Sequence, residues 1–143
     1  MSNIKEILSK SKTIAMIGVS KDPTKPSTIV MKYMQKYGYK VVPVNPKAKG
    51  EKILGEEVFG KLEEIKIPID IVDVFRPSNE VLKIAEDTVK IKAKVLWLQL
   101  GIRSDEAKTT VELNNIEYVE NRCTKMEYQK IFLKKNTSFS SFN

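Results

Sequence analysis

Short, almost continuous apolar segments recur along this chain and constrain its fold more than any other feature. They span residues 13–19, 40–44, 70–75 and 94–100. A strand that is covered on both faces reads as such a run, because neither face meets water. The segments therefore predict strands of a parallel sheet, and Pro43 indicates that the second of them lies at an edge or ends early.

Segments with helical character separate these strands, and serines stand at several of their starts. Ser2, Ser78 and Ser104 are predicted N-caps. Strands that alternate with helices of about ten residues imply right-handed βαβ units. The prediction is one α/β domain over residues 1–135, with a parallel sheet of about five strands, helices on both faces and a polar tail at 136–143. The predicted helices are 2–10, 27–37, 77–90, 104–114 and 123–133, with a last short strand at 116–119.

The composition excludes several classes of site. The 143 residues contain no histidine and one cysteine, Cys123. A Ser-His-Asp triad and a Cys-His pair are therefore excluded, and the composition argues against a zinc site. A single cysteine forms no internal disulfide, which predicts a reducing, cytoplasmic location. No apolar run approaches the length of a membrane helix. The net charge of +7 favours an anionic partner. With three arginines and scattered lysines, nucleic acid is the weaker choice.

The loops after the four strands carry the candidate site, because ligands of parallel α/β sheets bind beyond the carboxyl ends of the strands. Gly18 follows the first strand and permits a tight turn or the close approach of another backbone. The helix that begins near Pro26 offers free N–H groups to phosphate oxygens. Ser20 and Ser27 add hydroxyl groups there, and Lys25 adds charge. The alternative is a routine loop in which Ser27 caps the helix.

The three other loops add polar and basic groups. Asn45, followed by Pro46 and Lys47, stands where a dinucleotide-binding domain usually has an acidic residue for the ribose, which disfavours NAD. Arg76 ends the third strand and is placed to meet an anion, unless it pairs with a local carboxylate such as Asp73. Gln99, Leu100 and Gly101 end the fourth strand and give an amide and a turn facing the same crevice.

Taken in order, these motifs resemble a known family. They are similar to the motifs of small CoA-binding domain proteins. The five motifs are Gly18-Val19-Ser20 with Pro26-Ser27, P-V-N-P after the second strand, V-D-V-F-R-P after the third, W-L-Q-L-G-I-R after the fourth and N-R-C-x-K-x-E near the end. They also resemble the nucleotide-binding domain of the succinyl-CoA synthetase alpha subunit. The resemblance runs from about Lys12 to Phe132.

The resemblance implies a Rossmann-like domain that binds coenzyme A or an acyl-CoA. It matches Gly18, Val19, Ser20, Pro26 and Ser27 to the loop that holds the pyrophosphate. It matches Asn45, Pro46 and Lys47 to the loop near the adenosine and its 3′-phosphate. It matches Phe75, Arg76, Gln99, Leu100 and Gly101 to the wall of the crevice. Binding is implied, but catalysis is not, and Tyr128 stands where the family motif often has histidine.

Two other functions remain open at this point. One is an NAD(P)-dependent or thioester-handling enzyme with Cys123 as its nucleophile, whose pKa Arg122 and Lys125 would lower. The other is a regulatory or nucleic-acid-binding module that uses the lysine-rich surface. Self-association through Tyr128, Ile131 and Phe132 is a further hypothesis.

Overall fold

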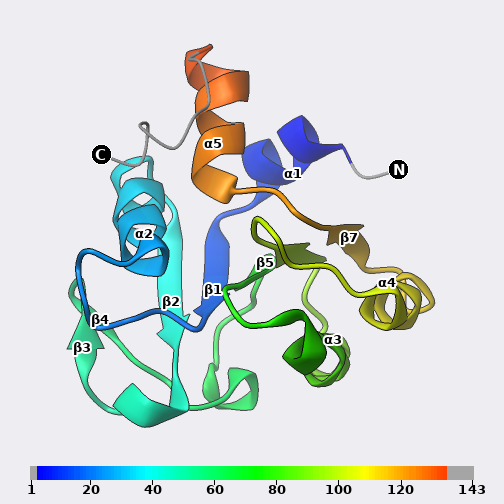
Figure 1. Ribbon diagram of the computed structural model, residues 1–143, viewed down its shortest axis with the longest axis horizontal. Coiled ribbons are helices and arrows are strands. Elements are labelled where there is room, and N and C mark those ends of the chain that lie inside the picture. Colours follow the sequence, from blue (N-terminus) through cyan, green and yellow to red (C-terminus); the bar gives the residue numbers. More distant parts are fainter. Residues whose placement is uncertain (1–2, 135–143) are drawn as a thin grey trace.

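Five parallel strands form the central sheet of the computed structural model, which describes residues 3–134. The strands lie in the order β2-β1-β5-β6-β7 (Figure 1). The predicted α/β, Rossmann-like parallel sheet is therefore confirmed. The strands are β1 (Thr13–Ile17), β2 (Lys40–Val44), β5 (Ile71–Val74), β6 (Val95–Leu98) and β7 (Glu117–Val119).

The order of the strands reverses between β1 and β5. The chain first moves from β1 outward to β2, and then returns past β1 to lay down β5, β6 and β7 on the other side. The loops after β1 and β5 consequently leave the sheet in opposite directions, which opens a crevice between them. Backbone bonds hold both loops at this edge, from Gly18 N to the Val44 carbonyl at 2.9 Å and from Phe75 N to the Ile17 carbonyl at 2.8 Å.

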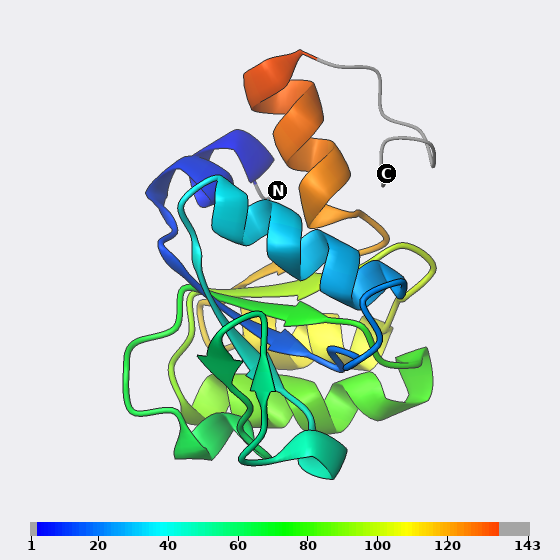
Figure 2. The ribbon, with the colours of Figure 1, turned by 90° about the vertical axis from the view of Figure 1, so that its left-hand side faces the viewer.

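Helices cover both faces of the sheet, as predicted (Figure 2). One face packs against α1, α2 and α5 through a core that includes Met16, Met31 and Trp97. The other packs against α3 and α4 through a core that includes Val72, Ala85 and Leu96. The helices are α1 (Ile4–Lys10), α2 (Pro26–Lys36), α3 (Val81–Lys90), α4 (Asp105–Glu112) and α5 (Thr124–Tyr128), the last continuing as a π-helical turn, Gln129–Leu133.

A long excursion follows β2 and is fastened to its end. It contains two 3₁₀ turns, Pro46–Ala48 and Leu62–Glu64, and a small hairpin of β3 (Lys52–Ile53) and β4 (Glu56–Glu57). Phe59 N donates to the Pro43 carbonyl at 3.0 Å, and its own carbonyl accepts from Asn45 N at 2.8 Å. The predicted edge position of β2 is confirmed, and the excursion is held beside the carboxyl end of that strand.

The helix starts agree with the prediction in part. Ser104 caps α4 as predicted, since its hydroxyl accepts from Ala107 N at 3.1 Å. Asn3 caps α1 by accepting from Glu6 N, while Ser2 lies outside the described residues. The prediction for Ser78 is wrong: its hydroxyl accepts from Arg103 N at 3.1 Å, and a 3₁₀ turn, Ser78–Glu80, precedes α3. The loops after β5 and β6 are neighbours, so the hydroxyl of Ser78 accepts a hydrogen bond from the loop after β6 and does not cap α3.

Trp97 lies in β6, between β5 and β7, and has no exposed surface. Its indole N–H donates to the Arg122 carbonyl at 2.7 Å, which ties β6 to the loop that leads into α5.

Within residues 3–134, no helix combines the length and apolarity needed to cross a bilayer. The predicted tail at 136–143 lies outside the described residues, so the proposed domain boundary stays a prediction.

Candidate functional site

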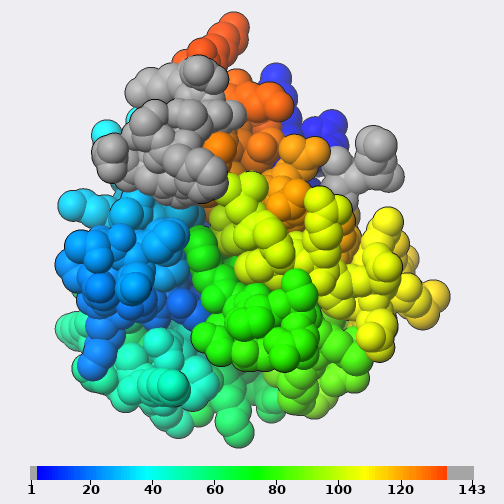
Figure 3. All heavy atoms as spheres, in the orientation of Figure 1, coloured from blue at the N-terminus to red at the C-terminus, as the bar shows by residue number. Residues whose placement is uncertain are grey.

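The chain turns at Gly18 directly after β1, with a φ angle of +90°. A Cβ at this position would lie 2.7 Å from the Phe75 carbonyl oxygen and 2.9 Å from Cδ of Arg76. The predicted close approach of another backbone is confirmed, and it comes from the loop after β5. Figure 3 shows the blue β1–α2 segment beside the green segment that follows β5. Gly18 thus forms the floor of the crevice between the two loops.

The loop that leads into α2 is braced by its own side chains. The Ser27 hydroxyl accepts from Ser20 N at 3.0 Å, and the Thr28 hydroxyl donates to the Ser20 carbonyl at 2.7 Å. Ser27 is therefore not the helix cap: Lys25 holds that position and makes no side-chain cap bond. Pro26 is the first residue of the helix, and within the described residues the amides of Ser27 and Thr28 have no acceptor. These two N–H groups remain available to an anion.

The side chain of Asn45 joins the loops after β1 and β2. The Asn45 amide donates from Nδ2 to the Val19 carbonyl at 2.9 Å, and its Oδ1 accepts from Lys47 N at 3.0 Å. Val19 itself is buried in the core, so only its backbone belongs to the crevice. Both ends of the Asn45 amide are engaged within the protein. Asn45 therefore positions Pro46 and Lys47 beside Gly18.

A cavity of about 370 Å³ lies at this point, on the side of the sheet that α3 covers. It brings together five of the predicted residues, namely Gly18, Asn45, Pro46, Lys47 and Arg76. The cavity is also lined by residues that no sequence motif indicated, among them Gly60, Lys61, Leu62, Glu80, Ile84 and Asp87. The segment after β2 supplies the first three of these residues, the 3₁₀ turn Ser78–Glu80 supplies Glu80, and α3 supplies the other two. Lys61 carried a weak signal only, a lysine next to a short apolar segment.

The charges around the cavity are unevenly paired. Arg76 donates through Nε and Nη2 to the Glu80 carboxylate at 3.1 and 2.7 Å, and not to Asp73 as one alternative had it. These bonds raise the pKa of Arg76 and lower the pKa of Glu80. Lys47 and Lys61 form no ion pair with any residue between 3 and 134. The cavity therefore has two cations free to meet an anionic ligand.

The residues after β6 do not line the cavity. Gln99 is 3% exposed, and its amide nitrogen donates to Asp73 at 2.6 Å and to the Thr124 hydroxyl at 3.1 Å, so the predicted amide facing the crevice points into the protein. Burial raises the pKa of Asp73 to about 7, against the opposing effect of these hydrogen bonds. Leu100 is 40% exposed, and Gly101 N donates to Asn121 Oδ1 at 2.7 Å.

Cys123 stands directly before α5 and is only 2% exposed. Burial raises the pKa of its thiol to about 11, the opposite of the shift that a nucleophilic cysteine needs. The backbone bonds from Met126 and Lys125 act in the other direction and are outweighed. This environment argues against Cys123 as the nucleophile of an enzyme.

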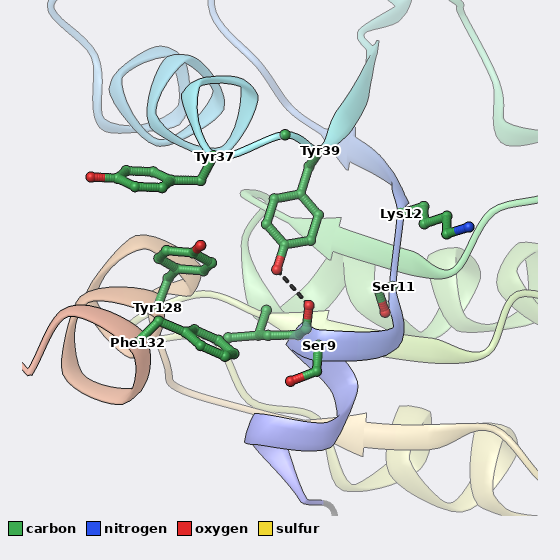
Figure 4. A pocket seen from close by; sticks show the side chains of 9 residues that line it. Ser9, Ser11, Lys12, Tyr37, Tyr39, Tyr128 and Phe132 are labelled. Carbon is green, nitrogen blue, oxygen red and sulfur yellow. Dashed lines mark hydrogen bonds between the residues drawn. The ribbon is translucent and has the colours of Figure 1, made fainter.

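Tyr128 lies far from the cavity, in a hollow of about 380 Å³ at the opposite end of the sheet (Figure 4). Its ring packs against those of Tyr37 and Phe132, with centroids 4.9 and 4.7 Å apart. Lys12, which precedes β1, and Tyr39, which precedes β2, line the same hollow. Tyr128 is therefore part of an aromatic cluster between helices.

Comparison with known proteins identifies the family to which this chain belongs. A family model described as a CoA binding domain matches residues 12–129. The chain belongs to this CoA-binding family. It is 38% identical over 127 residues to YneT of Bacillus subtilis (strain 168), covering 89% of this chain and 93% of that one.

Solved structures share the fold of this chain. The structure of cell-free ID.343 from Thermus thermophilus has a TM-score of 0.87 and 37% identity, covering 92% of this chain and all of that chain. The dinucleotide-forming acetyl-coenzyme A synthetase 1 of Ca. Korarchaeum cryptofilum, in complex with phosphate and ADP, has a TM-score of 0.66 and 22% identity over 82% of this chain. This chain spans 27% of that synthetase, and the likeness shows a shared fold.

Proposed function

We propose that this protein binds coenzyme A, or an acyl-CoA, in the crevice between the loops after β1 and β5. The observation that carries the proposal is the cavity beside Gly18, in which Lys47, Lys61 and Arg76 meet at the point where strand order reverses. Membership in a CoA-binding family supports the same ligand. A cytoplasmic location fits the single buried thiol.

The nucleotide end of coenzyme A has three parts that match parts of the site. The free amides at the start of α2, the Ser20 hydroxyl and Arg76 suit the diphosphate. Lys47 and Lys61 suit the 3′-phosphate, which distinguishes coenzyme A from other adenine nucleotides. Apolar atoms of Pro46, Leu62 and Ile84 suit the adenine ring. Asn45 accepts and donates within the protein, and offers a ribose diol no carboxylate, which disfavours NAD.

The chemistry of Cys123 and of the surface lysines favours a protein that binds coenzyme A without catalysing a reaction. The buried Cys123 thiol is unsuited to attack. The nucleic-acid alternative is weakened because surface lysines are paired with glutamates, as in Lys21–Glu51, Lys40–Glu56 and Lys49–Glu64. Such pairing leaves a mixed surface in place of a basic stripe.

Isothermal titration calorimetry tests the proposal with CoA, acetyl-CoA, dephospho-CoA, NAD and ATP in one buffer. CoA and acetyl-CoA are expected to bind most tightly, because only they carry both the diphosphate and the 3′-phosphate. Tighter binding of NAD or ATP than of CoA would contradict the proposal. Titration at two salt concentrations adds a check, since a ligand held by lysines loses affinity as salt rises.

A further inference from the structure

The guanidinium of Arg76 is held on one side by Glu80. Nε and Nη2 donate to the two carboxylate oxygens at 3.1 and 2.7 Å, the two-pronged geometry in which arginine binds carboxylates and phosphates alike. A diphosphate offers arginine the same kind of acceptors with more negative charge. Glu80 and a ligand phosphate are therefore alternative partners for the same donors.

The position of Arg76 makes this alternative relevant to the crevice. Its Cδ lies over Gly18, 2.9 Å from where a Cβ would stand, so its side chain crosses the floor of the crevice. Arg76 and Glu80 both line the cavity. Within residues 3–134, theirs is the one ion pair in which both partners do so.

The pair is also placed to exchange partners easily. Both side chains are 45% exposed, and surface ion pairs of this kind contribute little to stability. Glu80 ends the 3₁₀ turn Ser78–Glu80, four residues after Arg76, so the contact is local. Arg76 can leave Glu80 by rotating its side chain, without disturbing the sheet or α3.

We infer that Glu80 competes with the ligand diphosphate for Arg76 and thereby limits the affinity of the site. This inference rests on the proposed binding of coenzyme A. Ligand binding exchanges a carboxylate for a diphosphate on the guanidinium, and the affinity is reduced by the ion pair that must be broken. Removing the charge of Glu80 leaves Nε and Nη2 of Arg76 free before the ligand arrives, because an amide competes less well than a carboxylate for a cation.

Calorimetry with CoA and dephospho-CoA tests this on the parent protein and on Glu80→Gln. The variant is expected to bind both ligands about two- to fivefold more tightly, since both carry the diphosphate. Glu6→Gln is the matched control: it removes the same charge from an i,i+4 pair, with Lys10, away from the cavity. Its affinities are expected to stay at the parent values. Asp87→Asn removes a charge that lines the cavity but pairs with Lys83, and is expected to tighten binding less than Glu80→Gln.

The possible outcomes separate this inference from the proposed function. CoA binding by the parent with no gain in Glu80→Gln overturns the inference and leaves the function standing. An equal gain in Asp87→Asn also overturns it, because the effect would then be one of general charge. A gain for CoA without one for dephospho-CoA overturns the assignment to the diphosphate. Absence of CoA binding in the parent rejects both proposals.

Discussion

The carbonyl oxygen of Phe75 lies 2.7 Å from the point where Gly18 would carry a Cβ. The two residues directly follow the neighbouring strands β1 and β5, whose loops diverge at this place. Glycine is therefore required here by the protein itself, before any ligand is considered. A loss of CoA binding on replacing Gly18 would not by itself show that the residue touches a phosphate.

Gly18→Ala is expected to lower the free energy of unfolding by at least about 3 kcal/mol, because the added methyl group meets a backbone atom and the φ angle is unfavourable. Gly38→Ala is the control, since Gly38 has a φ of +96° but no atom within 4 Å of its Cβ position. That variant is expected to lose about 1 kcal/mol. Urea unfolding measures both, and equal losses would show that the contact with Phe75 contributes nothing.

Ser27→Ala is expected to destabilise the protein by about 1–2 kcal/mol, because Ser20 N would lose its acceptor in a half-buried loop. Lys25→Ala is the control at the true cap position, where the side chain makes no cap bond, and should change stability by less than about 0.5 kcal/mol. Thermal and urea unfolding compare the two. A larger loss in Lys25→Ala would restore helix capping as the main effect in this loop.

Asp73→Asn is expected to change how stability depends on pH. The folded-state pKa of Asp73, about 7, lies above its ordinary value of 3.8, so the folded protein holds this proton more strongly than the unfolded chain. Asp73 therefore lowers stability as pH rises from about 4 to about 7, by at most about 1.4 kcal/mol per pH unit. The stability of the variant relative to the parent should rise over this range and level off above it. A difference that stays constant from pH 4 to 8 would contradict the shifted pKa.

Lys47→Gln and Lys61→Gln are expected to weaken CoA binding more than dephospho-CoA binding. If either lysine contacts the 3′-phosphate, the preference for CoA should fall by about 1–3 kcal/mol, the range for a charge-assisted hydrogen bond. Lys52→Gln, on the exposed hairpin outside the cavity, controls for the change in net charge. Calorimetry with both ligands gives the preference directly. An unchanged preference in both cavity variants would remove these lysines from phosphate recognition.

Cys123 is expected to react with iodoacetamide far more slowly than free cysteine at pH 8, because its thiol is buried and its pKa is about 11. Labelling should accelerate with urea in parallel with global unfolding. Rapid labelling of the folded protein would revive the thiol-enzyme alternative. Mass spectrometry follows the reaction at this single cysteine.

The strands of the sheet were predictable because a buried parallel strand is a short apolar run that can be recognised from its own residues. The segment 40–44 reads as a buried strand, and it is β2 at the predicted residues. What the sequence did not reveal depends on partners distant along the chain. Gln99 turns inward because Asp73 and Thr124 lie behind it. Lys61 joins the cavity because Phe59 pairs with the end of β2. Neither relationship leaves a periodic pattern.

Trp97, the only tryptophan of the chain, lies in β6. It is shielded from water, and its indole N–H is bonded to the loop before α5. Its fluorescence therefore belongs to the interior and should shift to longer wavelength when the sheet opens. The protein carries its own optical probe of folding, so the unfolding of every variant can be followed without a dye. Movement of the loop at Arg122 would alter the same emission, because the carbonyl of that residue accepts the hydrogen bond of the indole.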